Sequence, residues 1–182
     1  MAKKIDDRRR EQVLSPWVTL VTHSVRLPNW DAARDFHSLK QADYVAMFAV
    51  TGDGSIPLVR QYRCALGRFT LELPSGLRDA GEDPRQTAIR ELYEETGYAP
   101  GAEVTLLGCS APDVGRLENA SWCYFTSGAV RTSSPAWQAE PEVESLLVSR
   151  EELKRLILSG EFCDAPHIAC VMLAVLQGCF GF

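Results

Sequence analysis

The chain has 182 residues, of which 46% are hydrophobic and 24% are charged. This composition excludes a wholly disordered chain, a collagen-like repeat and a coiled-coil rod, and the length suits one domain with a small appendage. The formal net charge of −5 argues against nucleic acid or an anionic membrane as the main partner, but it still permits a phosphate-bearing substrate.

Targeting signals and cysteine chemistry give no sign of export. The longest apolar run, residues 168–176, is shorter than the roughly 18 residues that a membrane span requires. The charged N-terminus, residues 1–12, lacks the apolar stretch of a secretory signal. The six cysteines form no CxxC pair and lie mostly within apolar runs. We therefore expect buried free thiols, no zinc site and a cytoplasmic location.

Runs of β-branched residues and turn-forming residues divide the chain into short strands around one well-marked helix. Residues 1–15 are expected to form a frayed or partly helical tail. Strands are expected at 17–26, 44–50, 57–62, 69–73, 104–109, 122–126 and 145–148. A loop covers 74–82, and helices are expected at 84–96, 151–158 and 166–176. This order favours an α+β fold with a mixed sheet and helices on both faces.

The helix at 84–96 has clear signals at both ends. Asp83 can cap its first turn, and Pro84 suits the first helical position. Gln86 follows the cap by three residues, as in a capping box, and Gly97 can end the helix in the left-handed conformation. The apolar stripe expected to pack on the sheet consists of Ala88, Ile89 and Leu92.

The other face of this helix carries Glu91, Glu94 and Glu95, which the spacing places side by side. One interpretation is a solvated acidic face, partly relieved by Arg90. The other is a site for a hard divalent cation, because magnesium prefers carboxylate and phosphate oxygens.

The wider spacing favours the second interpretation. From Gly76 to Tyr98 the sequence reads G-x5-E-x7-R-E-U-x-E-E-x-G-U, with every fixed position filled over 23 residues. This segment resembles the signature of the Nudix hydrolases. The resemblance implies the Nudix fold, an α/β/α sandwich around a mixed sheet, and hydrolysis of a nucleoside diphosphate linked to another moiety. Gly76 and Gly97 would then serve a close approach and a left-handed cap.

The resemblance also assigns roles to the acidic residues. Glu91, Glu94 and Glu95 would bind Mg²⁺, for which Mn²⁺ could substitute, and Glu82 would be an outer or additional ligand. Arg90 would hold these carboxylates by ion pairing.

The segments before the motif narrow the resemblance. Residues 61–63 (QYR) and 71–76 (LELPSG) resemble the ADP-ribose and ADP-sugar pyrophosphatases. Ser75 stands where that branch usually has alanine, and its main-chain carbonyl would bind metal. Arg63 would clamp a phosphate, unless it is an ordinary surface arginine. Glu72 would contact or support the substrate, unless it is an outward-facing strand residue.

A later loop bears on the sugar end of the substrate. Pro112 lies 112 − 97 = 15 residues after Gly97, where this branch has a proline in Ser-Pro-Gly, but its neighbours here differ. The sugar preference therefore stays open. Arg116 is a second candidate phosphate contact, and Glu118 or Asn119 would take the polar role beyond this loop.

The general base is expected in the acidic loop before the last strand. Glu140 is the first choice and Glu142 the reserve, and the competing interpretation is a solvated acidic loop. By the same resemblance, residues 1–42 form an N-terminal β extension for dimerisation or substrate binding, and 43–182 form the Nudix domain. Trp17 and Trp30 would stack on an adenine, or belong to the core or an interface of a homodimer.

The function expected from these features is Mg²⁺-dependent hydrolysis of the pyrophosphate bond of ADP-ribose or a related nucleoside diphosphate sugar. The products would be a nucleoside monophosphate and a sugar phosphate. Two alternatives stay open: a Nudix hydrolase for dinucleotides or dinucleoside polyphosphates, and a non-catalytic nucleotide-sensing module. The intact carboxylate set speaks against the sensor. His23, His37 and His167 receive no role.

Overall fold

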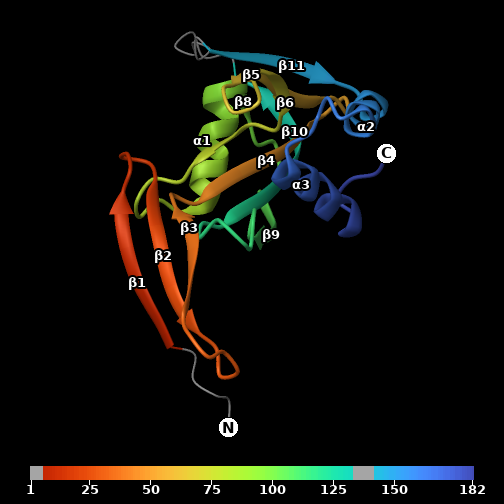
Figure 1. Cartoon of the computed structure of the whole chain (residues 1–182). Helices are drawn as coiled ribbons and strands as arrows, with labels where there is room; N and C mark the ends of the chain where they lie inside the picture. The colour runs from red at the N-terminus through yellow and green to blue at the C-terminus, as the bar shows by residue number, and fades with distance from the viewer. Residues whose placement is uncertain (1–5, 133–141) are drawn as a thin grey trace. The chain divides into compact units, whose positions relative to one another are not determined.

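The computed structural model describes residues 6–132 and 142–182, which form two compact units (Figure 1). The first unit comprises Met1–Ala42 and Ala111–Ala120. The second comprises Asp43–Ser110 and Ser121–Phe182.

The first unit is built on a three-stranded antiparallel sheet in the order β1-β2-β3. Its strands are β1 (Asp6–Val13), β2 (Thr19–Arg26) and β3 (Arg34–Lys40). The prediction of a frayed or partly helical tail is therefore wrong for residues 6–13. This segment pairs with β2 along its whole length, from Asp6 opposite Arg26 to Val13 opposite Thr19. Residues 8–13 are exposed, so the strand lacks the alternation of buried and exposed positions that reveals a strand in a sequence.

The loop at 111–120 belongs to the first unit because its main chain bonds to β3. The Leu39 amide donates to the Arg116 carbonyl at 2.7 Å, and the Glu118 amide donates to the Leu39 carbonyl at 3.0 Å. These two bonds extend the sheet by a short parallel bridge between Leu39 and Leu117. The loop is thus held by regular ladder bonds, which fixes the side chains that it carries.

The second unit contains a mixed five-stranded sheet in the order β7-β4-β10-β8, with β9 also paired to β10. The strands are β4 (Tyr44–Thr51), β7 (Ser75–Leu77), β8 (Tyr98–Ala99), β9 (Thr105–Ser110) and β10 (Ser121–Arg131). Strands β4 and β10 are parallel, and their other neighbours are antiparallel. A second, antiparallel sheet has the order β11-β5-β6, with β5 (Ile56–Arg63), β6 (Arg68–Glu72) and β11 (Val143–Val148).

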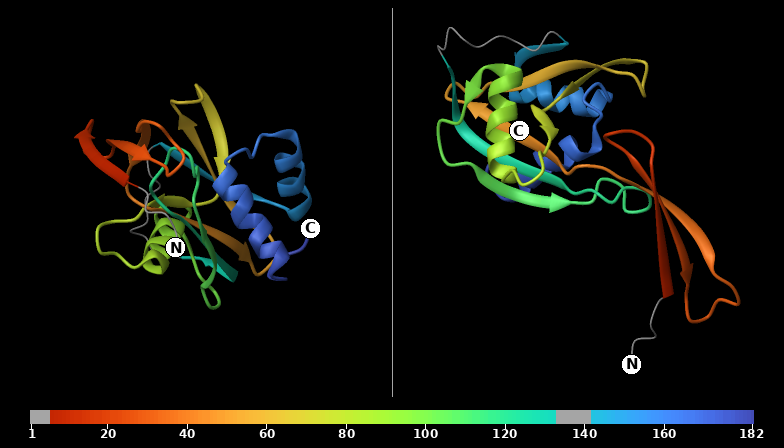
Figure 2. Two further views of the ribbon diagram at one scale, coloured as in Figure 1. Left: turned by 60° about the horizontal axis from the view of Figure 1, so that its bottom comes forward. Right: turned by 90° about the vertical axis from the view of Figure 1, so that its left-hand side faces the viewer.

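Helices cover both faces of the mixed sheet (Figures 1 and 2). They are α1 (Pro84–Thr96), α2 (Arg150–Ser159) and α3 (Ala165–Leu176). Successive side chains of strand β4 point to opposite faces of the sheet, so the strand contributes to the core on both faces. Val45, Met47 and Ala49 share one core cluster with two residues of α1, Ala88 and Leu92. The alternate positions Ala46, Phe48 and Val50 belong to a second cluster with buried residues of α2 and α3. The expected α+β sandwich around a mixed sheet is confirmed.

The expected helices and most strands of the second unit match the structure closely, and the bounds of α1 coincide with those predicted. The sequence did not reveal β3, β7 or β8, which are exposed or only two to three residues long. The six cysteines are free thiols, but Cys64 and Cys109 are exposed, so burial holds fully only for Cys123 and Cys170. No helix in the described part of the chain has the length and hydrophobicity to cross a bilayer.

Candidate metal and phosphate site

Helix α1 is fixed at both ends by the residues that the sequence singled out. The Asp83 carboxylate accepts hydrogen bonds from the amides of Arg85 at 2.8 Å and Gln86 at 3.4 Å. Gly97 has φ of 72° in the left-handed region, and its amide donates to the Tyr93 carbonyl at 2.8 Å. These caps fix where the helix begins and ends.

The acidic face is largely buried. Glu91 is 8% exposed and Glu95 is 5% exposed, whereas the side chain of Glu94 is 41% exposed. A carboxylate leaves water only when hydrogen bonds or cations compensate its charge. The interpretation as a solvated acidic face therefore fails for two of the three residues.

Arg90 binds three of the predicted carboxylates at once. Its Nη1 donates to Glu91 Oε1 and to Glu94 Oε2, both at 2.8 Å. Its Nε and Nη2 donate to the two oxygens of Glu82, at 3.1 and 3.2 Å. Hydrogen bonding to Arg90 lowers the pKa of Glu82 to about 2, and the same bond to Glu82, with those to Glu94 and Glu91, raises the pKa of Arg90.

Strand β7 lies against the same carboxylates. The Ser75 amide donates to Glu95 Oε2 at 2.7 Å. A Cβ on Gly76 would lie 2.0 Å from Glu91 Oε1, so any side chain at this position would force the Glu91 carboxylate to move. The close approach expected of Gly76 is confirmed. The sheet positions this segment, because Ser75 pairs with Ala46 of β4.

The donor set suits a hard divalent cation, since it consists of carboxylates beside a strand with main-chain carbonyls. Within residues 6–132 and 142–182, however, no group of three or more His, Cys, Asp or Glu side chains is arranged to hold a metal ion. The side chains thus have the right ligand chemistry, although they are not gathered into a metal-binding group. In this structure the cation that engages Glu82, Glu91 and Glu94 is Arg90.

Arg63 and Glu72 form a bidentate ion pair nearby. Arg63 Nε donates to Glu72 Oε1 at 2.7 Å, and Nη2 donates to Oε2. Thr70 Oγ1 also donates to Glu72, at 2.6 Å. Glu72 is 2% exposed, so it is a buried partner of Arg63 and not an outward-facing strand residue.

The electrostatics of this pair connect it to α1. Burial raises the pKa of Glu72. Hydrogen bonds from Arg63 and Thr70 lower this pKa by more than burial raises it, so the net shift is downward. The hydrogen bond to Glu72 raises the pKa of Arg63, and the Glu95 carboxylate raises it further through space. Arg63 thus lies within the field of the Glu95 carboxylate on α1.

A pocket of about 630 Å³ opens beside this pair. Its lining residues are Gln61, Tyr62, Arg63, Cys64, Phe69 and Glu142. The structure therefore brings Arg63 and Glu142 to one cavity. Glu140 lies outside the described residues.

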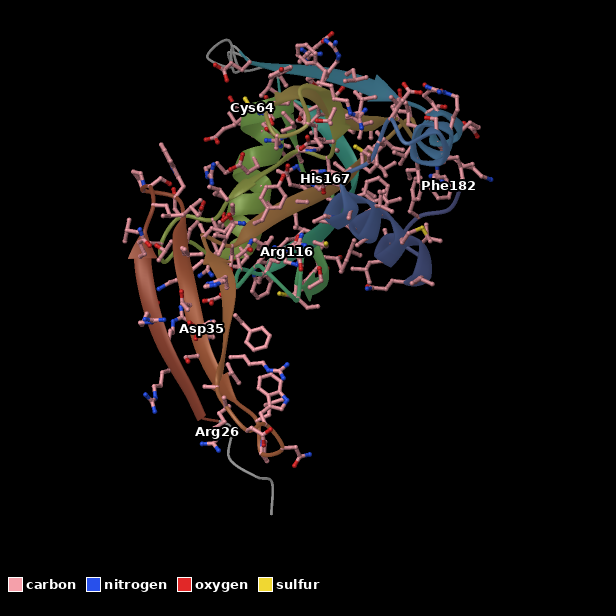
Figure 3. All side chains as sticks on the ribbon, in the orientation of Figure 1. Arg26, Asp35, Cys64, Arg116, His167 and Phe182 are labelled. Atoms are coloured by element: carbon pink, nitrogen blue, oxygen red, sulfur yellow. The ribbon has the colours of Figure 1, made fainter. Side chains whose placement is uncertain are left out.

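The other predicted substrate contacts belong to the first unit. Trp17 is 69% exposed. The ring of Trp30 stacks on Phe36, with ring centroids 5.9 Å apart, and Arg34 lies over it at 4.6 Å. Pro112 is partly buried, and the side chain of Arg116, labelled in Figure 3, is 82% exposed.

Two clusters of side chains were not predicted from the sequence, or were predicted only in part. Glu118, considered only as a polar residue, accepts hydrogen bonds from Arg9 at 2.8 Å and from Ser38, and lies 2.9 Å from His23 Nε2. Tyr44 and His167 meet beside Ser75, although 123 residues separate them in the chain. A separation of that size leaves no local spacing that could have revealed the contact.

Comparisons with known proteins agree with this geometry. The NUDIX domain model matches residues 40–169. An ADP-ribose pyrophosphatase from Bacillus subtilis (strain 168) is 43% identical over 170 residues, which cover 92% of this chain and 91% of that protein. A methanol dehydrogenase activator from Bacillus methanolicus is 30% identical over 181 residues, 97% of each chain.

The fold has a solved counterpart as well. The crystal structure of an ADP compounds hydrolase matches with a TM-score of 0.81, covering 97% of this chain and 96% of that chain at 19% sequence identity. At that identity the likeness is one of fold alone. Together with the domain match over residues 40–169, which includes α1 and its carboxylates, these findings show that the chain belongs to the Nudix hydrolase family.

Proposed function

We propose that this protein hydrolyses the pyrophosphate bond of ADP-ribose or a related nucleoside diphosphate sugar, giving a nucleoside monophosphate and a sugar phosphate. One observation carries the proposal: α1 buries Glu91 and Glu95 against the main chain of Ser75 and Gly76. Burying carboxylates costs free energy that hydrogen bonds or cations must offset, and a bound cation would offset it together with Arg90 and the Ser75 amide. The similarity to an ADP-ribose pyrophosphatase along most of the chain supports this choice of substrate.

The proposed ligands of Mg²⁺, or of Mn²⁺ in its place, are Glu91, Glu94, Glu95 and the Ser75 carbonyl, with Glu82 as an outer or additional ligand. When bound, the ion would offset phosphate charge and lower the pKa of a coordinated water. Arg90 would share these carboxylates with it and keep them gathered when it is absent, as its bonds to Glu82, Glu91 and Glu94 indicate.

The pocket lined by Arg63 suits the diphosphate. Arg63 would bind phosphate oxygens with its planar guanidinium, and Glu72 would hold that guanidinium in one orientation through its bidentate pair. Glu140 would accept the proton of the attacking water, with Glu142, which lines this pocket, as the reserve.

Residues of the first unit are also proposed as substrate contacts. Trp17 or Trp30 would stack on the adenine, while Pro112 and Arg116 would contact the sugar or a phosphate. The exposure of Trp17 and Arg116 supports such a role, because both side chains reach solvent. These contacts, and assembly as a homodimer, are parts of the proposal that size-exclusion chromatography with light scattering and single substitutions can test separately.

A substrate panel tests the function directly. The purified chain is assayed with Mg²⁺ and with Mn²⁺ against ADP-ribose, ADP-glucose, GDP-mannose, UDP-glucose, NADH, diadenosine polyphosphates and nucleoside triphosphates. We expect ADP-ribose to give the highest kcat/KM, with AMP and ribose 5-phosphate as products.

Other outcomes would redirect the assignment. A dinucleotide or polyphosphate as the best substrate would keep a Nudix hydrolase but reject the nucleoside diphosphate sugar. Tight binding of ADP-ribose without turnover under any metal condition would instead identify a nucleotide-sensing module.

A further inference from the structure

A buried histidine lies beside the candidate site without belonging to it. His167, labelled in Figure 3 at the start of α3, has no exposed surface. Its Nδ1 accepts a hydrogen bond from the Leu73 amide at 3.3 Å, and its Nε2 lies 3.2 Å from the Tyr44 hydroxyl. The two rings stack with centroids 5.7 Å apart. A buried imidazole with both nitrogens engaged is held in one orientation.

The Leu73 amide fixes the direction of these bonds. A backbone N–H can only donate, so Nδ1 of His167 must be the acceptor. Burial lowers the pKa of His167, although Asp164 and Glu72 act in the opposite direction, so the ring is neutral near pH 7. The neutral ring then carries its proton on Nε2 and donates it to the oxygen of Tyr44.

The bonds continue from Tyr44 to α1. Because the Tyr44 oxygen accepts from His167, its own proton is available for Ser75 Oγ, which lies 2.5 Å away. The Ser75 amide in turn donates to Glu95 Oε2 at 2.7 Å. The bonds therefore connect α3, β4, β7 and α1 in a defined order, which we call the His167 relay: His167, Tyr44, Ser75, Glu95.

We propose that Tyr44 and His167 are positioning residues for the metal site, acting by holding the main chain of Ser75 in place beside Glu95. Strand β7 has only three residues and a single described neighbour strand, β4. A ladder this short restrains the chain weakly, so a side-chain anchor adds substantially to its rigidity. This inference rests on the proposed use of Ser75 and Glu95 as metal ligands, but not on the identity of the substrate.

Metal affinity, measured without substrate, tests the proposal. The dissociation constant of Mn²⁺ is determined by electron paramagnetic resonance for the wild type, Tyr44→Phe, Ser75→Ala and the double variant. Each substitution removes one oxygen from the relay and keeps the carbon framework, so the fold should persist. Loss of a supporting hydrogen bond around a metal site typically weakens affinity by about 10- to 100-fold.

We expect each single variant to weaken Mn²⁺ binding by about 10-fold or more. The double variant should bind Mn²⁺ no more weakly than whichever single variant binds it more weakly, because both substitutions remove the hydrogen bond between Tyr44 and Ser75. Tyr98→Phe is the matched control: this tyrosine is buried in the same unit, in the core cluster around α1, and lies outside the relay. Its affinity should equal that of the wild type.

Two results would overturn the inference. Wild-type Mn²⁺ affinity in both Tyr44→Phe and Ser75→Ala, even with lowered thermal stability, would reduce the relay to ordinary core packing. Failure of the wild type itself to bind Mn²⁺ would reject the metal ligands and this inference together. Mn²⁺ binding without hydrolysis of ADP-ribose would reject only the proposed substrate and leave the relay standing.

Discussion

Two clusters of charged side chains in this protein balance their charges in opposite ways. In the first unit, one carboxylate, Glu118, meets three partners: Arg9, His23 and Ser38. In the second unit, one guanidinium, that of Arg90, serves three carboxylates: Glu82, Glu91 and Glu94. In the Glu118 cluster three partners surround a single carboxylate, whereas Arg90 and its three carboxylates together carry one positive charge and three negative charges. Only the Arg90 cluster therefore offers oxygen ligands to a further cation.

The largest effect is expected at the carboxylate that faces β7. Glu95→Gln should lower kcat for ADP-ribose at saturating Mg²⁺ by several orders of magnitude, because the amide keeps the shape but loses the charge that holds a cation. The fold should persist, since the amide oxygen can still accept from Ser75. The control is Glu103→Gln, at an exposed position of the same unit. Turnover close to that of the wild type would contradict the assignment of Glu95.

If the carboxylates around Arg90 bind metal, the general base must lie elsewhere. Glu140→Gln should then lower kcat by roughly 10²–10⁴-fold with little change in KM. Glu142→Gln is the matched variant, since Glu142 lines the pocket with Arg63. A severe defect in Glu142→Gln alone would transfer the role to Glu142. Full activity in both would mean that the acidic loop is only solvated and that the base lies on another element.

The clusters should also differ in their response to metal. Arg90→Gln should lower the free energy of unfolding without metal by roughly 1–3 kcal/mol, because it leaves partly buried carboxylates without their shared donor. Added Mg²⁺ should recover more stability in this variant than in the wild type, since the ion replaces the missing positive charge. Urea unfolding with and without Mg²⁺ measures both quantities. An equal response to Mg²⁺ in the two proteins would count against a cation site at Arg90.

The smallest effect is expected in the first unit. Glu118→Gln should lower the free energy of unfolding by about 1 kcal/mol at pH 7, with or without Mg²⁺. Hydrogen bonds from Ser38 and His23 lower the pKa of Glu118 from 4.5 to about 2. Its contribution is therefore complete above pH 4.5 and is lost as the pH falls towards 2. Urea unfolding at pH 7 and pH 3 should show the variant's deficit shrinking at the lower pH, and a deficit that Mg²⁺ removes would erase the contrast with Arg90.

The elements that were predictable from the sequence are those defined by neighbouring residues. Helix α1 begins and ends where expected because Asp83, Pro84 and Gly97 act within one turn of the residues that they cap. The spacing of Glu91, Glu94 and Glu95 likewise placed them on one face. What local spacing could not show was that Glu91 and Glu95 would be buried.

The remaining features depend on partners far away in the chain. Strand β1 is highly charged and exposed, and it is a strand because β2 supplies its hydrogen bonds. The partner of Tyr44 is His167, which lies 123 residues later on another helix. Such pairings are set by the folded topology, so composition and periodicity carry no trace of them.

The space beside Gly76 sets a rule for how this sequence can change. Because a Cβ at position 76 would meet Glu91 Oε1 at 2.0 Å, glycine at this position leaves the Glu91 carboxylate in place, and its own backbone angles do not demand a glycine. A larger residue at 76 becomes acceptable only if position 91 shortens or turns away. Positions 76 and 91 are therefore expected to covary among related sequences. Where the glutamate at 91 is replaced by a smaller residue, substitutions of the glycine at 76 should become tolerated.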